Sequence, residues 1–308
     1  MQLVRSVTAC APQLRASRVL TIGAFDGVHL GHQEIFRQAL HIGAERRQPL
    51  AAFCFEPTPS EFFARGEPPA RLTCFRERFE QLDAIGIDEL ICPPFQAVSS
   101  IEHSGFVRDV LVGQLGVSHI VVGHDFRYGA GRAGTVETLS EAGAAHGFGV
   151  TMVDPVYAAG ERISSTRIRE ALGRGDLDSA ASMLGRDYSM SGRVVHGLGL
   201  GRDLGFPTAN VNLKRRRAPV DGIFAVRVDG LREPSLAGVA SVGSRPTVGG
   251  GKTLLEVYLF DFDTSIYGAY ITVRFQKRLR SEHHFGSIAA LQEQMRADVV
   301  AAKAALGG

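Results

Sequence analysis

The chain has 308 residues, of which 44% are hydrophobic and 21% are charged, with 36 glycines and 13 prolines. This composition is that of an ordinary globular protein with room for about two domains, and it excludes a fibre or a disordered chain. Because 34 Lys and Arg nearly balance 32 Asp and Glu, the formal net charge is only +2. We therefore expect neither a nucleic acid nor a membrane as partner.

Neither the N-terminal stretch nor the cysteines indicate export. The first stretch holds scattered arginines and no long unbroken apolar run, so it predicts neither a signal peptide nor an anchor, and we expect a cytoplasmic protein. The cysteines form no C-x-x-C pair, and we expect reduced, mostly buried thiols and no disulfide framework or zinc site. They are Cys10, Cys54, Cys74 and Cys92.

Short apolar runs alternate with helix-like stretches in the first part of the chain. Helices are predicted over residues 34–47 and 75–85. Buried strands are predicted over residues 19–25, 50–55, 89–92 and 119–123. This order predicts an open parallel sheet covered by helices, with ligands expected beyond the carboxyl ends of the strands.

The second part is predicted to be strand after strand. Ile271, Val273 and Phe275 alternate with polar residues, which is the period of a sheet exposed to water on one side. Strands are predicted over residues 189–196, 208–213, 222–228, 236–243, 253–260 and 270–278. They predict a small six-stranded antiparallel barrel, followed from about residue 287 by an amphipathic helix. The change of pattern predicts two domains, 1–185 and 186–308.

A glycine-rich turn over residues 23–32 follows the first predicted strand and opens a helix. The free N–H groups of such a helix start favour an anion. His29 and His32 are three residues apart, close enough to lie on one face of the turn, and Gly27 and Gly31 let the backbone approach closely. A lone histidine is more often structural, but this combination favours phosphate binding.

A second helix start lies at residues 163–169. Ordinary N-capping would explain one or two of its hydroxyl residues. Here Ser164, Ser165 and Thr166 are followed at once by Arg167, so hydroxyls, backbone amides and a guanidinium could converge on a polyphosphate. We expect this helix start to serve the same crevice as the two histidines.

The second part holds a glycine-rich run over residues 197–210 that matches neither nucleotide fingerprint. Thr208 and Asn210 are two apart on a predicted strand, so their oxygens point the same way and suit Mg²⁺ on nucleotide phosphates. Such a pair is more often an exposed face. Glu256 lies in an otherwise apolar strand, where it either points to water or has a function.

These motifs resemble the bifunctional bacterial riboflavin kinase/FMN adenylyltransferase family, also called prokaryotic FAD synthetase. The resemblance covers nearly the full length of the chain. It implies a Rossmann-like nucleotidyltransferase domain followed by a barrel kinase domain, with riboflavin, FMN and FAD as substrates and products, ATP as co-substrate and Mg²⁺ as cofactor. The motifs that carry it are residues 23–32, 55–59, 123–129, 163–167 and 205–210.

For the first half, the resemblance implies that His29 and His32 stabilise charge on the transferred phosphoryl group. The helix start would hold the β and γ phosphates of ATP, and Phe126 and Arg127 would bind flavin. Thr58 stands where the family usually has His or Asn, so a flavin contact there would be weaker unless the hydroxyl substitutes. The residues implied for ATP are Gly23, Phe25, Asp26, Gly31, Asp125, Ser164, Ser165, Thr166 and Arg167.

For the second half, the resemblance implies that Glu256 is the general base that deprotonates the terminal ribityl hydroxyl of riboflavin. Thr208 and Asn210 would hold Mg²⁺. The glycine-rich run would bind ATP through Gly199, Gly201 and Arg202. We expect the basic run at residues 214–217 to be a solvated loop between two strands.

Two alternatives stay open. Only one half could be active, with Thr58 as the first reason to doubt the adenylyltransferase. The protein could instead be a flavin-sensing binder that has kept the pockets without turnover. Assaying each half on its own substrate decides whether only one half is active. Flavin binding without ATP consumption would favour the flavin-sensing binder.

Overall fold

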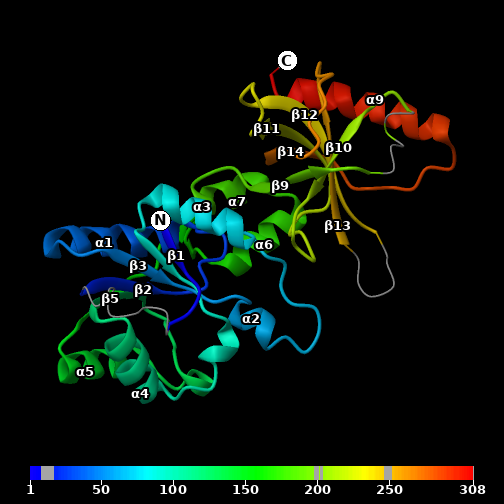
Figure 1. Cartoon of the computed structure of the whole chain (residues 1–308). Coiled ribbons are helices and arrows are strands. Elements are labelled where there is room, and N and C mark those ends of the chain that lie inside the picture. The colour runs from blue at the N-terminus through cyan, green and yellow to red at the C-terminus, as the bar shows by residue number, and fades with distance from the viewer. Residues whose placement is uncertain (8–16, 198–200, 202–203, 246–251, 308) are drawn as a thin grey trace. The chain divides into compact units, whose positions relative to one another are not determined.

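The computed structural model describes residues 1–7, 17–197, 201, 204–245 and 252–307. The chain divides into two compact units (Figure 1). The first unit comprises Met1–Pro69 and Arg78–Ile163, and the second comprises Ala70–Glu77 and Ser164–Gly308. The predicted domain boundary near residue 185 stays a prediction.

A six-stranded parallel sheet forms the centre of the first unit, in the order β1-β4-β3-β2-β5-β6. Strands β2 and β3 are mostly apolar and are buried along their whole length, as expected for a sheet covered on both faces. The buried charge of Arg18 in β2 is paired with Glu89 of β4. The strands are β1 (Gln2–Val4), β2 (Arg18–Ile22), β3 (Leu50–Phe53), β4 (Glu89–Ile91), β5 (Val117–Gly123) and β6 (Gly149–Val153).

Helices cover both faces of this sheet, with α1 (Leu30–Arg46) on one side and α5 (Val136–His146) on the other (Figure 1). An apolar core of this unit includes Phe106, Leu111 and Leu139, which are buried together with residues of the sheet. Other helices are α2 (Pro59–Phe62), α4 (His103–Gly105) and α3 (Phe75–Ile85), whose residues up to Glu77 belong to the second unit. The first unit also contains a π-helical segment (Phe106–Gln114), 3₁₀ segments (Phe95–Ala97 and Ala130–Arg132) and the hairpin of β7 (Tyr157–Ala158) and β8 (Glu161–Arg162).

The second unit contains a closed antiparallel barrel in the order β10-β13-β12-β11-β14-β9. The helix α9 (Ile288–Ala305) packs on the outside of the barrel, where Ala302 meets Ala225 and Phe260 (Figure 1). The second unit also contains α6 (Ser165–Arg174) and α7 (Leu177–Leu184). The strands are β9 (Ser189–Val195), β10 (Thr208–Asn212), β11 (Gly222–Asp229), β12 (Leu236–Arg245), β13 (Lys252–Leu259) and β14 (Tyr270–Arg280).

The predicted fold class is confirmed: a helix-covered parallel sheet is followed by a six-stranded antiparallel barrel and a C-terminal helix. The six barrel strands lie within two residues of their predicted bounds, because short apolar runs bounded by turn residues mark strands in the sequence. The predicted helix over residues 75–85 is also confirmed. Strands β1 and β6 were not among those predicted.

The basic run at residues 214–217 lies in the loop between β10 and β11, as predicted, but one of its arginines is not solvated. Lys214, Arg216 and Arg217 are exposed, but Arg215 is buried. Its guanidinium forms an ion pair with Glu77 and donates a hydrogen bond to the Tyr188 hydroxyl at 3.0 Å. The charge is buried because a carboxylate from a distant segment balances it, which a local sequence pattern cannot reveal.

Cys54, Cys74 and Cys92 are free, buried thiols, as predicted, and Cys10 lies outside the described residues. Among the residues that the structure describes, no helix combines the length and the apolar character needed to cross a bilayer.

Candidate active sites

The histidine turn, residues 23–32, runs from the end of β2 to the start of α1. Its backbone is unusual, since Phe25, Gly27 and Val28 all have positive φ angles of 50°, 86° and 41°. Gly27 adopts this conformation without strain, whereas the two other residues need the surrounding fold to hold them. The turn therefore brings the chain sharply into the helix, whose first N–H groups are left without intrahelical partners.

His29 and His32 lie together at this helix start, as the sequence predicts. His29 is the N-cap of α1, and its Nδ1 accepts a hydrogen bond from the backbone N–H of His32 at 3.3 Å. The two rings are stacked, with centroids 3.6 Å apart and planes 17° apart. A Cβ on Gly31 would come within 3.2 Å of the His29 ring, so a glycine leaves room for it.

The electrostatics of the turn keep His32 neutral. Burial lowers the pKa of His32 well below its usual value, and the electrostatic effects of the neighbouring His29 and Arg78 lower it further. Among the described residues, the enclosed Nδ1 of His32 has no hydrogen-bond partner. A bound anion would offset the desolvation and could take a hydrogen bond from this ring.

Two further predicted residues pack around the histidines. The Phe25 ring meets His32 edge to face at 5.3 Å, and a Cβ on Gly23 would come within 2.8 Å of Phe25. Asp26 is buried in the same turn. Gly23, Phe25 and Gly31 thus shape the histidine pair, while their contact with ATP stays a prediction.

Arg78 is a residue that the sequence reasoning missed. Its buried guanidinium donates hydrogen bonds to the carbonyl of Ala24 at 2.9 Å and to Glu56 Oε2 at 3.2 Å. Arg78 therefore holds the histidine turn in place and adds positive charge close to it. A signal was present, because Arg78 lies three residues after Phe75 and four before Leu82, on the apolar face of α3.

The end of β5 carries the other predicted residues of the first unit. Partial burial raises the pKa of Asp125, but an ion pair with Arg162 outweighs it, and the net shift is downward. Phe126 is partly buried and stacked on Tyr128 with centroids 5.8 Å apart. Arg127 is exposed. Their nucleotide and flavin contacts stay predictions.

Thr58 is the N-cap of the short helix α2. Its backbone N–H and its hydroxyl both donate hydrogen bonds to Glu61 Oε2, each at 3.0 Å. The side chain is buried, and its hydroxyl already serves this local capping network. The flavin contact suggested for Thr58 stays a prediction.

The second helix start belongs to α6 in the other unit. Ser164 is the N-cap and accepts a hydrogen bond from the backbone N–H of Arg167 at 3.3 Å. Ordinary capping thus accounts for one of the three hydroxyls, while Ser165 and Thr166 lie in the first turn. The convergence of this helix start on the histidine turn stays a prediction.

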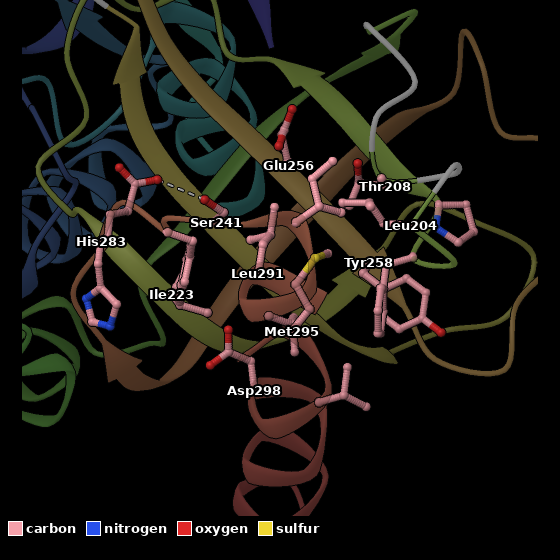
Figure 2. A pocket seen from close by; sticks show the side chains of 18 of the residues that line it. Leu204, Thr208, Ile223, Ser241, Glu256, Tyr258, His283, Leu291, Met295 and Asp298 are labelled. Atoms are coloured by element: carbon pink, nitrogen blue, oxygen red, sulfur yellow. Dashed lines mark hydrogen bonds between the residues drawn. The ribbon is translucent and has the colours of Figure 1, made fainter. Parts of the chain in front are cut away.

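In the barrel, strand register brings Thr208, Asn210 and Glu256 together. Asn210 on β10 pairs directly with Glu256 on β13, and Glu256 pairs on its other side with Ser241 on β12. Their neighbours Val211, Leu255 and Val257 are buried inside the barrel. Because side chains alternate along a strand, this polar set faces outward from the barrel wall. Figure 2 shows two of its members, Thr208 and Glu256.

Glycines bring the backbone close to these side chains. A Cβ on Gly197 would lie 2.2 Å from the Asn210 amide, and a Cβ on Gly201 would lie 3.0 Å from Thr208 Oγ1. Only a residue without a side chain permits such an approach. Gly199 and Arg202, also predicted for ATP, lie outside the described residues.

A cavity of about 890 Å³ adjoins the outward-facing polar set. Thr208, Asn210 and Glu256 are among the residues that line it, and Leu291 and Met295 of α9 supply an apolar wall (Figure 2). This is the size range of pockets that bind small organic ligands. The sequence patterns predicted the barrel and the helix but not the cavity between them.

Glu282 also reaches this cavity. Ser241 Oγ donates a hydrogen bond to Glu282 Oε1 at 3.0 Å, and a Cβ on Gly243 would lie 2.4 Å from the same carboxylate. Within the described ranges, no cluster of three or more His, Cys, Asp or Glu residues suits a metal. Thr208 and Asn210, whose oxygens are neutral, are the metal-ligand candidates.

The fold and the two sites define a class of protein: a two-part enzyme that transfers phosphate groups, with a nucleotidyltransferase-like unit and a barrel kinase. Residues 11–167 match the FAD synthetase family, and residues 184–306 match the riboflavin kinase family.

Curated relatives agree with this class over the full length. The chain is 42% identical to the bifunctional riboflavin kinase/FMN adenylyltransferase of Escherichia coli K12, covering 100% of this chain and 98% of the relative. It is 44% identical to the protein of the same name from Pseudomonas fluorescens, covering 99% and 97%. The chain therefore belongs to the bifunctional riboflavin kinase/FMN adenylyltransferase family.

A solved structure supports the same architecture. The crystal structure named as a macrolide-efflux protein from Streptococcus pneumoniae matches with a TM-score of 0.82 and 31% identity, covering 97% of each chain.

Proposed function

We propose that this chain phosphorylates riboflavin to FMN in its barrel unit and adenylylates FMN to FAD with its first unit, using ATP for both reactions. The observation that carries this proposal is that one chain holds two unlike sites suited to phosphate. One is a pair of stacked imidazoles at a helix start, and the other is a carboxylate beside hard oxygen donors.

In the adenylyltransferase, a phosphate oxygen of FMN attacks the α-phosphorus of ATP, and the bond to pyrophosphate breaks. Negative charge develops on the transferred group, where hydrogen-bond donors and a helix start give the largest stabilisation. His29 and His32 are placed to supply those donors, and the buried charge of Arg78 favours an anion nearby. That Ser164 and its helix start hold the leaving phosphates stays a prediction from the resemblance.

In the kinase, Glu256 removes the proton from the terminal ribityl hydroxyl as that oxygen attacks the γ-phosphorus of ATP. The new bond gives FMN, the bond to ADP breaks, and the proton stays on the carboxylate. A base of this kind contributes typically about 10²–10⁴ in rate. The cavity beside Glu256 is the proposed riboflavin site, since its apolar wall suits a planar aromatic ring.

The barrel residues fit a magnesium ion by their donor set. Thr208 and Asn210 present hard, neutral oxygens on one face of β10, next to the close backbone approach at Gly197 and Gly201. They would hold Mg²⁺, which when bound would neutralise charge on the ATP phosphates.

The test is to incubate the purified chain with riboflavin, ATP and Mg²⁺ and to separate the flavins by chromatography. FMN and then FAD should appear. Unchanged riboflavin would contradict the kinase, and FMN that is never converted would contradict the adenylyltransferase. Flavin binding without ATP consumption would instead favour a flavin-sensing protein.

Two predictions from the sequence remain part of this proposal. The division of labour between residues 1–185 and 186–308 is one of them. The cytoplasmic location is the other.

A further inference from the structure

The cavity is closed on one side by α9, and the two ends of this helix are held differently. Its C-terminal part is packed, since Ala302 lies in an apolar cluster with Ala225 and Phe260. Its N-terminal part, which carries Leu291 and Met295, lines the cavity (Figure 2). This part has the open cavity beneath it, so its position depends on polar anchors as well as on packing.

Asp298 lies between these two parts and is the strongest such anchor. Its carboxylate is buried and receives two hydrogen bonds from Arg280, at 2.8 Å from Nε and 2.6 Å from Nη2. Gln294, one turn earlier, donates a third at 2.9 Å. A two-point guanidinium–carboxylate pair fixes orientation as well as distance.

Arg280 also holds the loop that follows it. Its Nη1 donates a hydrogen bond to the Ser281 carbonyl at 2.9 Å, and its guanidinium lies 5.7 Å from the centre of the Phe285 ring. This loop carries Glu282 into the cavity. The Arg280 side chain thus links the end of β14 to the loop that follows it and to α9.

The local strand geometry explains how Arg280 reaches all three. The pairing of β14 with β11 is irregular near its end, where Arg280 faces Ile223 but Arg278 faces the next residue, Phe224. The extra residue between them is a bulge, which bends a strand and redirects its side chains. Ile223 and Arg280 both line the cavity as a result.

We propose that Arg280 is a positioning residue for riboflavin: by clamping Asp298 and the following loop, it sets the width of the slot that receives the planar flavin ring. This inference rests on the proposed function of the cavity. The clamp acts on the flavin wall and leaves Glu256, Thr208 and Asn210 on their own strands. Loss of the clamp should therefore weaken riboflavin binding without slowing phosphoryl transfer.

The experiment measures steady-state kinetics of the full chain, counting FMN plus FAD as product. Arg280→Met should raise the KM for riboflavin by about tenfold, with kcat and the KM for ATP within about twofold of their original values. Arg280→Lys keeps the charge but cannot make the two-point contact, so it should restore KM only in part.

Arg280→Met leaves a buried carboxylate unpaired and will lower stability, so two variants keep the test decisive. In Arg280→Met/Asp298→Leu that carboxylate is gone, so thermal stability should recover while the riboflavin KM stays high. Arg274→Met breaks another ion pair of β14, in which Nε lies 2.8 Å from Asp229 Oδ2, outside the cavity lining. It should leave the riboflavin KM unchanged.

Leu291→Trp tests the riboflavin cavity, and Arg280→Met tests the clamp, so the two assignments can fail separately. Leu291→Trp fills the slot, and an unchanged riboflavin KM in that variant would overturn the cavity as the riboflavin site. If Leu291→Trp raises KM but Arg280→Met does not, only the clamp is overturned. An equal KM rise in Arg274→Met, or a matching fall of kcat in Arg280→Met, would also overturn it.

Discussion

The two sites of this chain differ in whether they contain a carboxylate that can act as a base. The histidine turn holds imidazoles and a buried guanidinium but no carboxylate among its catalytic candidates, whereas the barrel site places Glu256 beside Asn210. The nucleophile of adenylyl transfer is a phosphate, which is already ionised near neutral pH. The nucleophile of the kinase is an alcohol, which must lose a proton as it attacks. Charge stabilisation therefore suffices at the histidine turn, whereas the barrel site also needs a base.

Removing the base Glu256 should have the largest effect on activity. Glu256→Gln keeps the size and the strand register of the side chain but cannot accept the proton. The rate of FMN formation should fall by about 10²–10⁴, while FAD formation from supplied FMN should not change. An unchanged rate of FMN formation in this variant would show that no carboxylate base is needed.

The imidazoles should give the next largest effect, on the other reaction. His32→Ala removes a donor and should lower kcat for FAD formation by about 10²–10³. His29→Asn should lose activity similarly while keeping a capping acceptor for α1, whereas His29→Ala should also cost about 0.5–2 kcal/mol of stability. FMN formation from riboflavin should be unaffected in all three, and a parallel loss of both activities would contradict separate sites.

The glycine-rich run offers a backbone test of the barrel site. In Gly197→Ala the new Cβ would meet the Asn210 amide at 2.2 Å, so the amide must move. Kinase activity should fall roughly 10²-fold, by analogy with the cost of displacing a positioned group by about 1 Å. The matched control is Gly173→Ala in α6, where a Cβ meets nothing within 4 Å. Equal activities of the two variants would contradict the proposed role of Asn210.

The smallest expected effect is a pH dependence of stability from His32. Its pKa in the folded chain lies well below the ordinary value of 6.5, so below pH 6.5 the unfolded chain binds a proton that the folded chain does not. The free energy of unfolding should therefore fall as the pH drops below about 6.5. Denaturant titrations of His32→Asn between pH 5 and 7 should show a weaker pH dependence.

Burial also lowers the pKa of His119, so the His32 substitution should remove only part of the slope. His119→Asn is the matched control and should remove another part. No change of slope in His32→Asn would contradict the neutral state assigned to this ring.

How far the sequence could predict the molecule depended on whether the signal was local. The hydrophobic pattern predicted every barrel strand, and the spacing of His29 and His32 predicted their common face, because both depend on neighbours along the chain. The burial of Arg215 against Glu77 and of Arg78 behind the histidine turn depends on partners far away in sequence. Local periodicity carries no information about such partners.

The cavity between the barrel and α9 illustrates the same limit. Its polar residues were predicted individually, since Thr208, Asn210 and Glu256 lie in recognisable motifs. Their meeting follows from the pairing of β10 with β13, and the width of the cavity follows from the contact of Arg280 with Asp298. Both are consequences of tertiary packing.

The most direct test of two separate phosphate sites is calorimetric titration of the full chain with a non-hydrolysable ATP analogue at saturating Mg²⁺. Two binding equivalents are expected. One should disappear in the double variant His29→Asn/His32→Ala, and the other in Asn210→Ala. A single equivalent in the unmodified chain, or one that both sets of substitutions abolish together, would contradict the account.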